Sequence, residues 1–212
     1  MKKLLFLTAI AILTFNSSIA QDDTDTSSGS DISFGVKAGA NFAALSGNSD
    51  SGQLVDTGLN IGAVVNIGIS EKFSIQPEVV YSAQGTSEWG FLSSNTYLEL
   101  GYLNIPVMAG YEVLKGLTIQ AGPQVGFNLS AKYQNNSDYD VKDIIEPIDF
   151  GVAFGAQYEL HFGMFFQARY ALGLNNIYSI TDKTNLPVGF TDQLDVDSKN
   201  MVLSLSVGYF FN

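Results

Sequence analysis

The chain has 212 residues and no cysteine, which excludes disulfides and thiolate metal sites and leaves the redox compartment unmarked. Its formal net charge of −11 excludes a nucleic-acid partner on electrostatic grounds. Only 15% of the residues are charged, against about 25% in typical soluble domains, so an ordinary water-facing surface is not expected.

The first 20 residues have the features of a secretory signal peptide. Two lysines precede an apolar run over residues 4–15, and Ser18-Ile19-Ala20 places small residues where signal peptidase cleaves. The run is too short for a membrane anchor, so we expect cleavage near Ala20. Loss of the two lysines would leave a mature chain with a formal charge of −13. Residues 21–31 are acidic and Ser-rich and are predicted to be a disordered leader.

Apolar and polar residues then alternate with a period of two in eight segments, which is the pattern of β-strands with two unlike faces. The segments are 32–43, 57–70, 73–84, 97–113, 116–131, 148–160, 164–175 and 201–211. Tight connections (70–72, 113–116, 161–163) alternate with long polar ones (44–56, 85–96, 132–147, 176–200). We therefore expect residues 32–212 to form an all-β domain, an eight-stranded antiparallel up-and-down transmembrane β-barrel with its large loops at one end.

The composition of the two faces decides what each one contacts. The apolar faces carry no charge, and the polar faces are rich in Gly, Ser, Asn and Gln rather than Lys and Glu. A soluble lipocalin-like carrier or a β-sandwich would need a charged outer face. In a membrane barrel the apolar face contacts lipid and small polar residues fill a narrow lumen. The expected location is the outer membrane of a Gram-negative bacterium, with outer-membrane lipid as the contact and a possible protein partner at the loops.

Two irregularities interrupt the alternation. Leu98, Leu100 and Tyr102 have the opposite parity to Leu103 and its followers, so we expect a bulge near 102–104. Prolines inside three of the segments remove ladder donors, so local bulges or breaks are expected there. These prolines are Pro77, Pro106 and Pro123.

Six charged residues fall on the face predicted to line the lumen. They are Lys37, Glu78, Glu99, Glu112, Glu159 and Arg169. Both signs are present, and a charge in a narrow lumen is costly unless it is paired. We expect a buried network that fills the lumen and conducts few or no ions; the competing interpretation is an ion path.

Aromatic residues gather near the predicted strand ends, as in the girdles of membrane barrels. At the short-turn end these are Phe73, Tyr111, Phe162, Phe165, Tyr209, Phe210 and Phe211, and at the loop end Phe42, Tyr97, Tyr133 and Tyr178.

Catalytic and metal-binding signals are weak. The one histidine, His161, falls in a predicted short turn, away from the loop end where barrel enzymes usually act. The loops hold acidic residues (Asp138, Asp140, Asp143, Glu146, Asp182, Asp192, Asp195 and Asp197), but their spacing matches no EF-hand. Glu78 and Glu99 lack the open cleft of a glycosidase. We expect no catalytic residue, no metal and no cofactor.

Seven segments in order resemble one family. They are "FGVKAGANFA", "FSIQPEVVYSAQG", "YLNIPVMAGYEV", "LTIQAGPQVGFNLSAK", "FGVAFGAQYEL", "FFQARYALGLNNI" and "LSLSVGYFF". Together they are similar to the PorT-type outer-membrane β-barrel family, with Gln-Pro-Glu and Gly-Pro-Gln as the more specific parts. The resemblance implies an eight-stranded barrel inserted by the outer-membrane assembly machinery. It also implies, more weakly, an accessory role in protein secretion. A small barrel enzyme acting on lipid and a soluble carrier are the two competing classes of protein.

Overall fold

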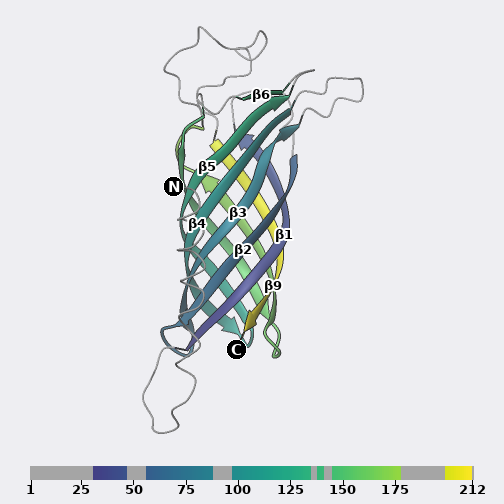
Figure 1. Ribbon diagram of the computed structural model, residues 1–212. Coiled ribbons are helices and arrows are strands. Elements are labelled where there is room, and N and C mark those ends of the chain that lie inside the picture. Colours follow the sequence, from purple (N-terminus) through teal and green to yellow (C-terminus); the bar gives the residue numbers. More distant parts are fainter. Residues whose placement is uncertain are drawn as a thin grey trace, which may run out of the picture.

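The computed structural model describes residues 31–46, 56–87, 97–134, 138–140, 145–177 and 199–211. Nine β-strands make up most of this described part, and Figure 1 shows them in chain order. The strands are β1 (Ile32–Ser46), β2 (Asp56–Gly68), β3 (Phe73–Ser87), β4 (Tyr97–Leu114), β5 (Leu117–Gln134), β6 (Asp138–Asp140), β7 (Ile148–Glu159), β8 (Met164–Gly173) and β9 (Lys199–Phe211). The predicted signal peptide, and the predicted leader up to residue 30, lie outside the described residues.

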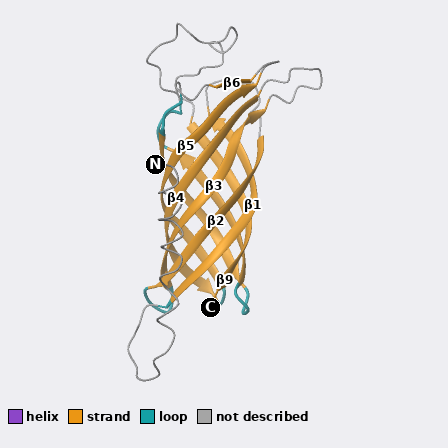
Figure 2. Cartoon of the chain, in the orientation of Figure 1, coloured by secondary structure: helices purple, strands orange, loops and turns teal. Residues whose placement is uncertain are grey.

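Eight of these strands close into an antiparallel barrel. β1 to β5 pair in chain order, β5 pairs with β7, and the series continues through β8 to β9, which pairs with β1. The tilted strands wrap around a single axis in Figures 1 and 2. This arrangement confirms the predicted eight-stranded up-and-down fold. The short strand β6, which the sequence pattern did not predict, pairs with the end of β5. No helix in the described part of the chain is long and apolar enough to cross a membrane.

The barrel strands are staggered around the axis. A path from each residue to its Cα partner on the next strand starts at Phe42 on β1 and passes through β9, β8, β7, β5, β4, β3 and β2. It returns to β1 at Ile32, ten residues before its starting point. The residues on this path are Phe42, Leu203, Tyr170, Phe154, Ala121, Ala109, Ile75, Ile67 and Ile32. All nine are apolar or aromatic. A stagger of this kind tilts the strands, and with eight strands the interior is only wide enough for side chains to fill it.

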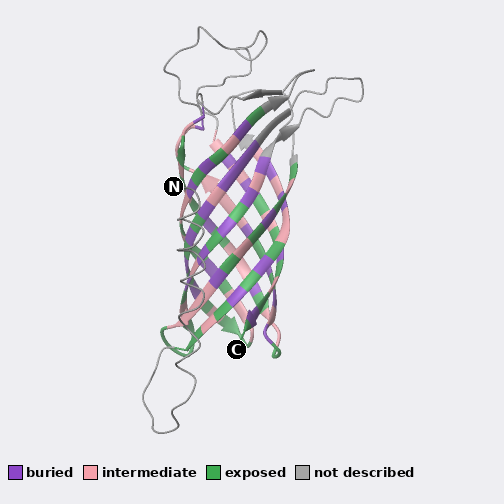
Figure 3. Ribbon diagram, viewed as in Figure 1, coloured by how far each residue is buried: buried purple, intermediate pink, exposed green. Residues whose placement is uncertain are grey.

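The apolar residues of the strands face outward. Phe127, Val152 and Leu205 are 37%, 41% and 48% exposed. The polar residues that alternate with the apolar ones along each strand are turned inward. Figure 3 shows exposed and buried residues alternating along the strands. An apolar exterior around a polar interior confirms the predicted orientation of the two faces and excludes the lipocalin-like carrier, whose apolar residues would enclose a central cavity.

The three tight turns lie at the same end of the barrel, between β2 and β3, β4 and β5, and β7 and β8. Gly116 and Gly163 have φ values of 81° and 89°, in the left-handed region that glycine adopts without steric cost. Each therefore allows its turn to reverse within a few residues. The strand ends joined by the longer connections lie at the opposite end, as predicted.

The expected bulge lies in β5, not in β4. The pairing of β4 with β5 shifts between Gly101–Ser130 and Tyr102–Asn128, which leaves Leu129 as the extra residue. Towards β3, β4 keeps one register. The reversed parity in β4 has a different cause: Leu100 and Tyr102 point inward and are buried near the loop end. The predicted position was therefore close to the observed irregularity, but its assignment to β4 was wrong, because Leu100 and Tyr102 are interior side chains and the extra residue belongs to β5.

The three strand prolines interrupt pairing without changing register. Between β3 and β4, the ladder is interrupted after the pair of Pro77 with Val107. It resumes in the same register at the pair of Val80 with Asn104. Pairing of β4 with β5 has a similar gap after Pro106–Gln124. Since proline has no N–H, the missing donors produce local breaks in the ladder. This confirms the expected breaks, and the register shows no bulge at these positions.

The aromatic residues near the short-turn end divide between the two faces. Phe73 and Tyr111 are cross-strand partners on the outside, with ring centroids 4.8 Å apart. Phe162, Tyr209 and Phe211 are also exposed. Phe165 and Phe210, however, are buried inside the barrel. Assigning these two to a girdle was wrong, because their positions in β8 and β9 have inward parity. The side chains of Tyr97, Tyr133 and Tyr178 lie outside the described residues.

Candidate functional site

The centre of the lumen holds an ion cluster built from three strands. Lys37 on β1 and Arg169 on β8 both contact Glu78 on β3. The Lys37 Nζ lies 2.6 Å from Glu78 Oε2, and the two terminal nitrogens of Arg169 donate to Oε2 and Oε1 at 2.7 Å each. All three residues are buried. The bidentate geometry with Arg169 is the strongest form of carboxylate pairing, and it compensates part of the cost of burying charge.

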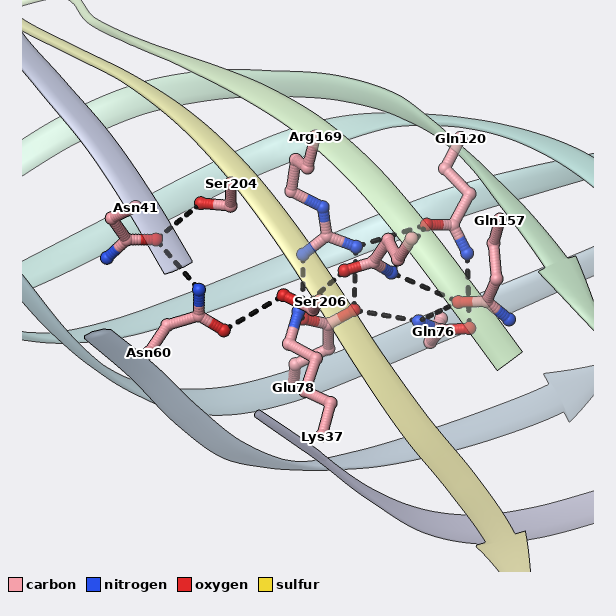
Figure 4. Close-up of polar contacts among 11 residues, drawn as sticks. Lys37, Asn41, Asn60, Gln76, Glu78, Gln120, Gln157, Arg169, Ser204 and Ser206 are labelled. Atoms are coloured by element: carbon pink, nitrogen blue, oxygen red, sulfur yellow. Dashed lines mark hydrogen bonds and ion pairs between the residues drawn. The ribbon is translucent and has the colours of Figure 1, made fainter. Parts of the chain in front are cut away.

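A layer of glutamines lies next to the ion cluster, on its short-turn side (Figure 4). Gln76 donates to Glu78 Oε1 at 2.7 Å, and Gln167 accepts from Lys37 at 2.8 Å. Gln120 accepts from Arg169 at 3.1 Å and from Gln167 at 3.2 Å. Gln157 accepts from both Gln76 and Gln167. The glutamines thus bind several of the polar groups of Lys37, Glu78 and Arg169 and join four strands across the lumen.

A second polar layer lies on the loop side of the ion cluster (Figure 4). Asn41 accepts from Asn60 and from Ser204 at 2.8 Å each, and it donates to Ser82 at 2.8 Å. Ser206 donates to Asn60 at 2.9 Å. These short side chains cross the lumen from β1, β2, β3 and β9. Together with the ion cluster and the glutamines they form what we call the lumen network.

An apolar cluster lies inside the barrel nearer the short turns. Val64, Phe165 and Phe210 pack together, and the two rings lie 4.7 Å apart. The Phe165 ring lies over its cross-strand partner Gly208, where an added Cβ would come within 2.2 Å of it. Beyond this cluster a vestibule of about 820 Å³ opens at the short-turn end. Its lining mixes charges of both signs, including Lys72, Glu112 and Glu159.

A third polar group lies inside the loop end. Asn200 on β9 donates to Asp149 on β7 at 2.7 Å. Tyr102 on β4 and its cross-strand partner Asn128 on β5 are buried nearby, and the Tyr102 hydroxyl and both polar atoms of the Asn128 amide have no hydrogen-bond partner in the described part of the chain. Buried polar groups of this kind normally bind ordered water.

Comparison with known families assigns this architecture. A family model described as the outer membrane protein beta-barrel domain matches residues 19–179, which is more than half of the chain. The chain belongs to this outer-membrane β-barrel family. Membership points to the outer membrane of a Gram-negative bacterium as its location. No protein with a curated description matches the chain.

Solved structures of small outer-membrane barrels resemble this outer-membrane barrel. Neisserial surface protein A has a TM-score of 0.56 and 16% identity, over 85% of this chain and 99% of that one. Ail of Yersinia pestis has a TM-score of 0.48 and 13% identity, over 84% of this chain and 98% of that one. OprG of Pseudomonas aeruginosa has a TM-score of 0.43 and 13% identity, over 89% of this chain and 100% of that one. At these identities, the similarity to the Neisserial protein supports the fold and no more.

Of the six charged residues predicted for the lumen, the five whose side chains are described occupy two places in this outer-membrane barrel, the ion cluster and the vestibule that Glu112 and Glu159 both line. Lys37, Glu78 and Arg169 meet in the ion cluster. Glu112 instead accepts a hydrogen bond from the backbone N–H of Gly116 in a short turn. Glu159 lines the vestibule. The side chain of Glu99 lies outside the described residues. The sequence could not separate these places, because inward parity does not give height along the axis.

The residues considered for metal binding are not brought together in the described part of this outer-membrane barrel. His161 is exposed in the turn between β7 and β8, with its ring against Phe162. No group of three or more His, Asp or Glu side chains that could hold a metal ion is found among the described residues. Apart from Glu146, which is described, the acidic side chains of the predicted loops fall outside this part of the chain.

The sequence predicted glutamines on the inner face, but the layer that four of them form beside the ion cluster was not predicted. Gln76, Gln120, Gln157 and Gln167 are all buried. Their signal was available, because each occupies an inward position in a segment whose outward positions are apolar. Four long amides near the short-turn ends of β3, β5, β7 and β8 indicate a layer that can bridge a narrow lumen.

Proposed function

We propose that this outer-membrane barrel is a non-conducting and non-enzymatic membrane element whose lumen is plugged by its own side chains. The observation that carries the proposal is the bidentate Arg169–Glu78 pair, tied to Lys37 and to the glutamine layer. An ion crossing the barrel would have to break buried charge-assisted hydrogen bonds at the centre and then pass the apolar cluster of Val64, Phe165 and Phe210. Its long connections would serve as an interaction surface for a protein partner.

Conductance in a planar bilayer tests the plug. The refolded barrel is expected to give no steady current steps, and steady nanosiemens channels would contradict the proposal. The triple variant Lys37→Ala, Glu78→Ala, Arg169→Ala is a matched comparison, because it removes the ion cluster and leaves the outer wall intact. Heat-modifiable migration on a gel shows whether each protein is folded. Because the apolar cluster remains in this variant, conducting steps are expected only when Phe165→Ala and Phe210→Ala are added to the triple variant and the protein still folds.

Export and insertion are part of the same proposal. Residues 1–20 would direct the chain to the periplasm and be removed near Ala20, and the outer-membrane assembly machinery would insert the barrel. The predicted signal sequence and the family assignment support this route. Membrane fractionation with intact-mass measurement tests it: a mature chain starting elsewhere than near Gln21 would contradict the cleavage site.

A second candidate is an accessory role in an outer-membrane protein-secretion system. It rests on the resemblance of seven sequence segments to the PorT-type family, which is narrower than the family assignment. Deleting the gene and comparing secreted proteins with those of a complemented strain tests this role. Unchanged secretion would contradict the accessory role and leave the structural role of a plugged barrel as the proposed function.

A further inference from the structure

The ion cluster carries an unbalanced positive charge. Lys37 and Arg169 contribute two positive charges, and Glu78 contributes one negative charge. Three other described carboxylates on the inner face lie in other places: Asp149 is bound by Asn200 towards the loop end, Glu112 is bound by Gly116 in a short turn, and Glu159 lines the vestibule. A buried charge without a counter-charge is strongly unfavourable. The centre of the described lumen therefore calls for one additional negative charge.

Donors without acceptors lie at the same place. The Arg169 Nε–H has no partner in the described part of the chain, although the side chain is only 5% exposed. Lys37 directs two of its three N–H groups to Glu78 and Gln167. The Ser82 oxygen accepts from Asn41 and from Gln84, so its own hydrogen is free to donate away from them. Three donors of this kind, two of them on cations, are what an anion requires.

A small cavity of about 30 Å³ adjoins these donors. Lys37, Arg169 and Ser82 line it together with amide side chains such as Asn60 and Gln84, whereas Glu78 is not among the described residues of its wall. A water molecule needs about 10–15 Å³ measured in this way, so the cavity accommodates one or two water-sized species and no polyatomic anion of phosphate size.

We propose that this cavity binds one small monovalent anion of halide size, held by Lys37, Arg169 and Ser82. The anion would neutralise the excess charge of the ion cluster and satisfy the Arg169 Nε–H. Water would satisfy the donors but would leave the charge unbalanced. The site rests on the proposed plugged lumen. Conductance tests the plug and anion-dependent unfolding tests the site, so either can fail without the other.

Thermal unfolding of the detergent-refolded barrel tests the site. The melting temperature is compared in sodium chloride, sodium bromide and sodium gluconate at equal ionic strength. Because an anion that binds the folded state stabilises it, halides at saturating concentration should raise the melting temperature by about 2–4 °C over gluconate. Lys37→Met should abolish this difference, because it neutralises the cluster and keeps the Arg169–Glu78 pair. Lys72→Met, in the exposed β2–β3 turn, should retain it.

Two unfolding results would overturn the anion site. One is an equal melting temperature of the wild-type barrel in all three salts. The other is a halide effect that persists unchanged in Lys37→Met, which would be a general salt effect. Ser82→Ala offers a milder second variant, and a reduced halide effect is expected from it. Anomalous diffraction from bromide-grown crystals gives the direct readout: a peak between Lys37 and Arg169 supports the site, and water only at that position contradicts it.

Discussion

Glu78 connects the two cations at the centre of the lumen network. Its two carboxylate oxygens accept hydrogen bonds from Lys37, Arg169 and Gln76. Glu78 is therefore the residue that holds the two cations together. Glu78→Gln keeps the shape of the side chain and removes its charge, which leaves two buried cations without a counter-charge. We expect this change to lower the free energy of unfolding by about 3–5 kcal/mol. A urea titration of the detergent-refolded barrel, read by heat-modifiable migration, measures the loss.

Glu71→Gln is the matched control for this prediction. Glu71 is exposed in the β2–β3 turn, so the same chemical change should alter the free energy of unfolding by no more than about 0.5 kcal/mol. If both variants unfold at the same urea concentration as the wild-type barrel, the ion cluster does not contribute to stability as its geometry indicates.

At the scale of the elements, the pairing of β8 with β9 depends on one small residue. Phe165 lies opposite Gly208, and a Cβ at Gly208 would come within 2.2 Å of the Phe165 ring. An aromatic side chain covering a cross-strand glycine is a recognised way to fix the register of a curved sheet. Gly208→Ala should therefore displace the ring and lower the free energy of unfolding by about 1–3 kcal/mol. Gly68→Ala is the control, because its added Cβ would meet nothing closer than 3.5 Å.

The strands were predictable from the sequence, but their finer geometry was not. Alternation over Leu205 and its neighbours gives the outward face directly, because lipid excludes charge along the whole wall. The bulge at Leu129 was assigned to the wrong strand, since an inward Leu100 and a bulged strand produce the same change of parity. The cluster of Lys37, Glu78 and Arg169 could be predicted as a pairing, but its partners depend on the stagger of all eight strands, which no single segment contains.

At the scale of the whole molecule, the barrel separates two environments that differ in polarity. Its wall presents apolar side chains around the full circuit from Phe42 to Ile32, and its centre holds charges tied by hydrogen bonds. In water this distribution would expose a continuous apolar surface and favour aggregation. In a bilayer it satisfies the backbone, since a closed barrel leaves no unpaired edge. The inside-out distribution is thus the property that ties this fold to a membrane.

Charges placed on the wall test this conclusion, because their cost depends on depth in the bilayer. Leu205 lies midway along β9 and is 48% exposed, whereas Ile32 is the first residue of β1. In lipid vesicles, Leu205→Arg should lower the free energy of unfolding by about 2–4 kcal/mol, and Ile32→Arg by about 0–1 kcal/mol. A wall in contact with water would tolerate both changes alike, since an exposed arginine costs little there. Equal and small effects in urea titrations of the vesicle-inserted variants would therefore contradict the membrane-facing wall.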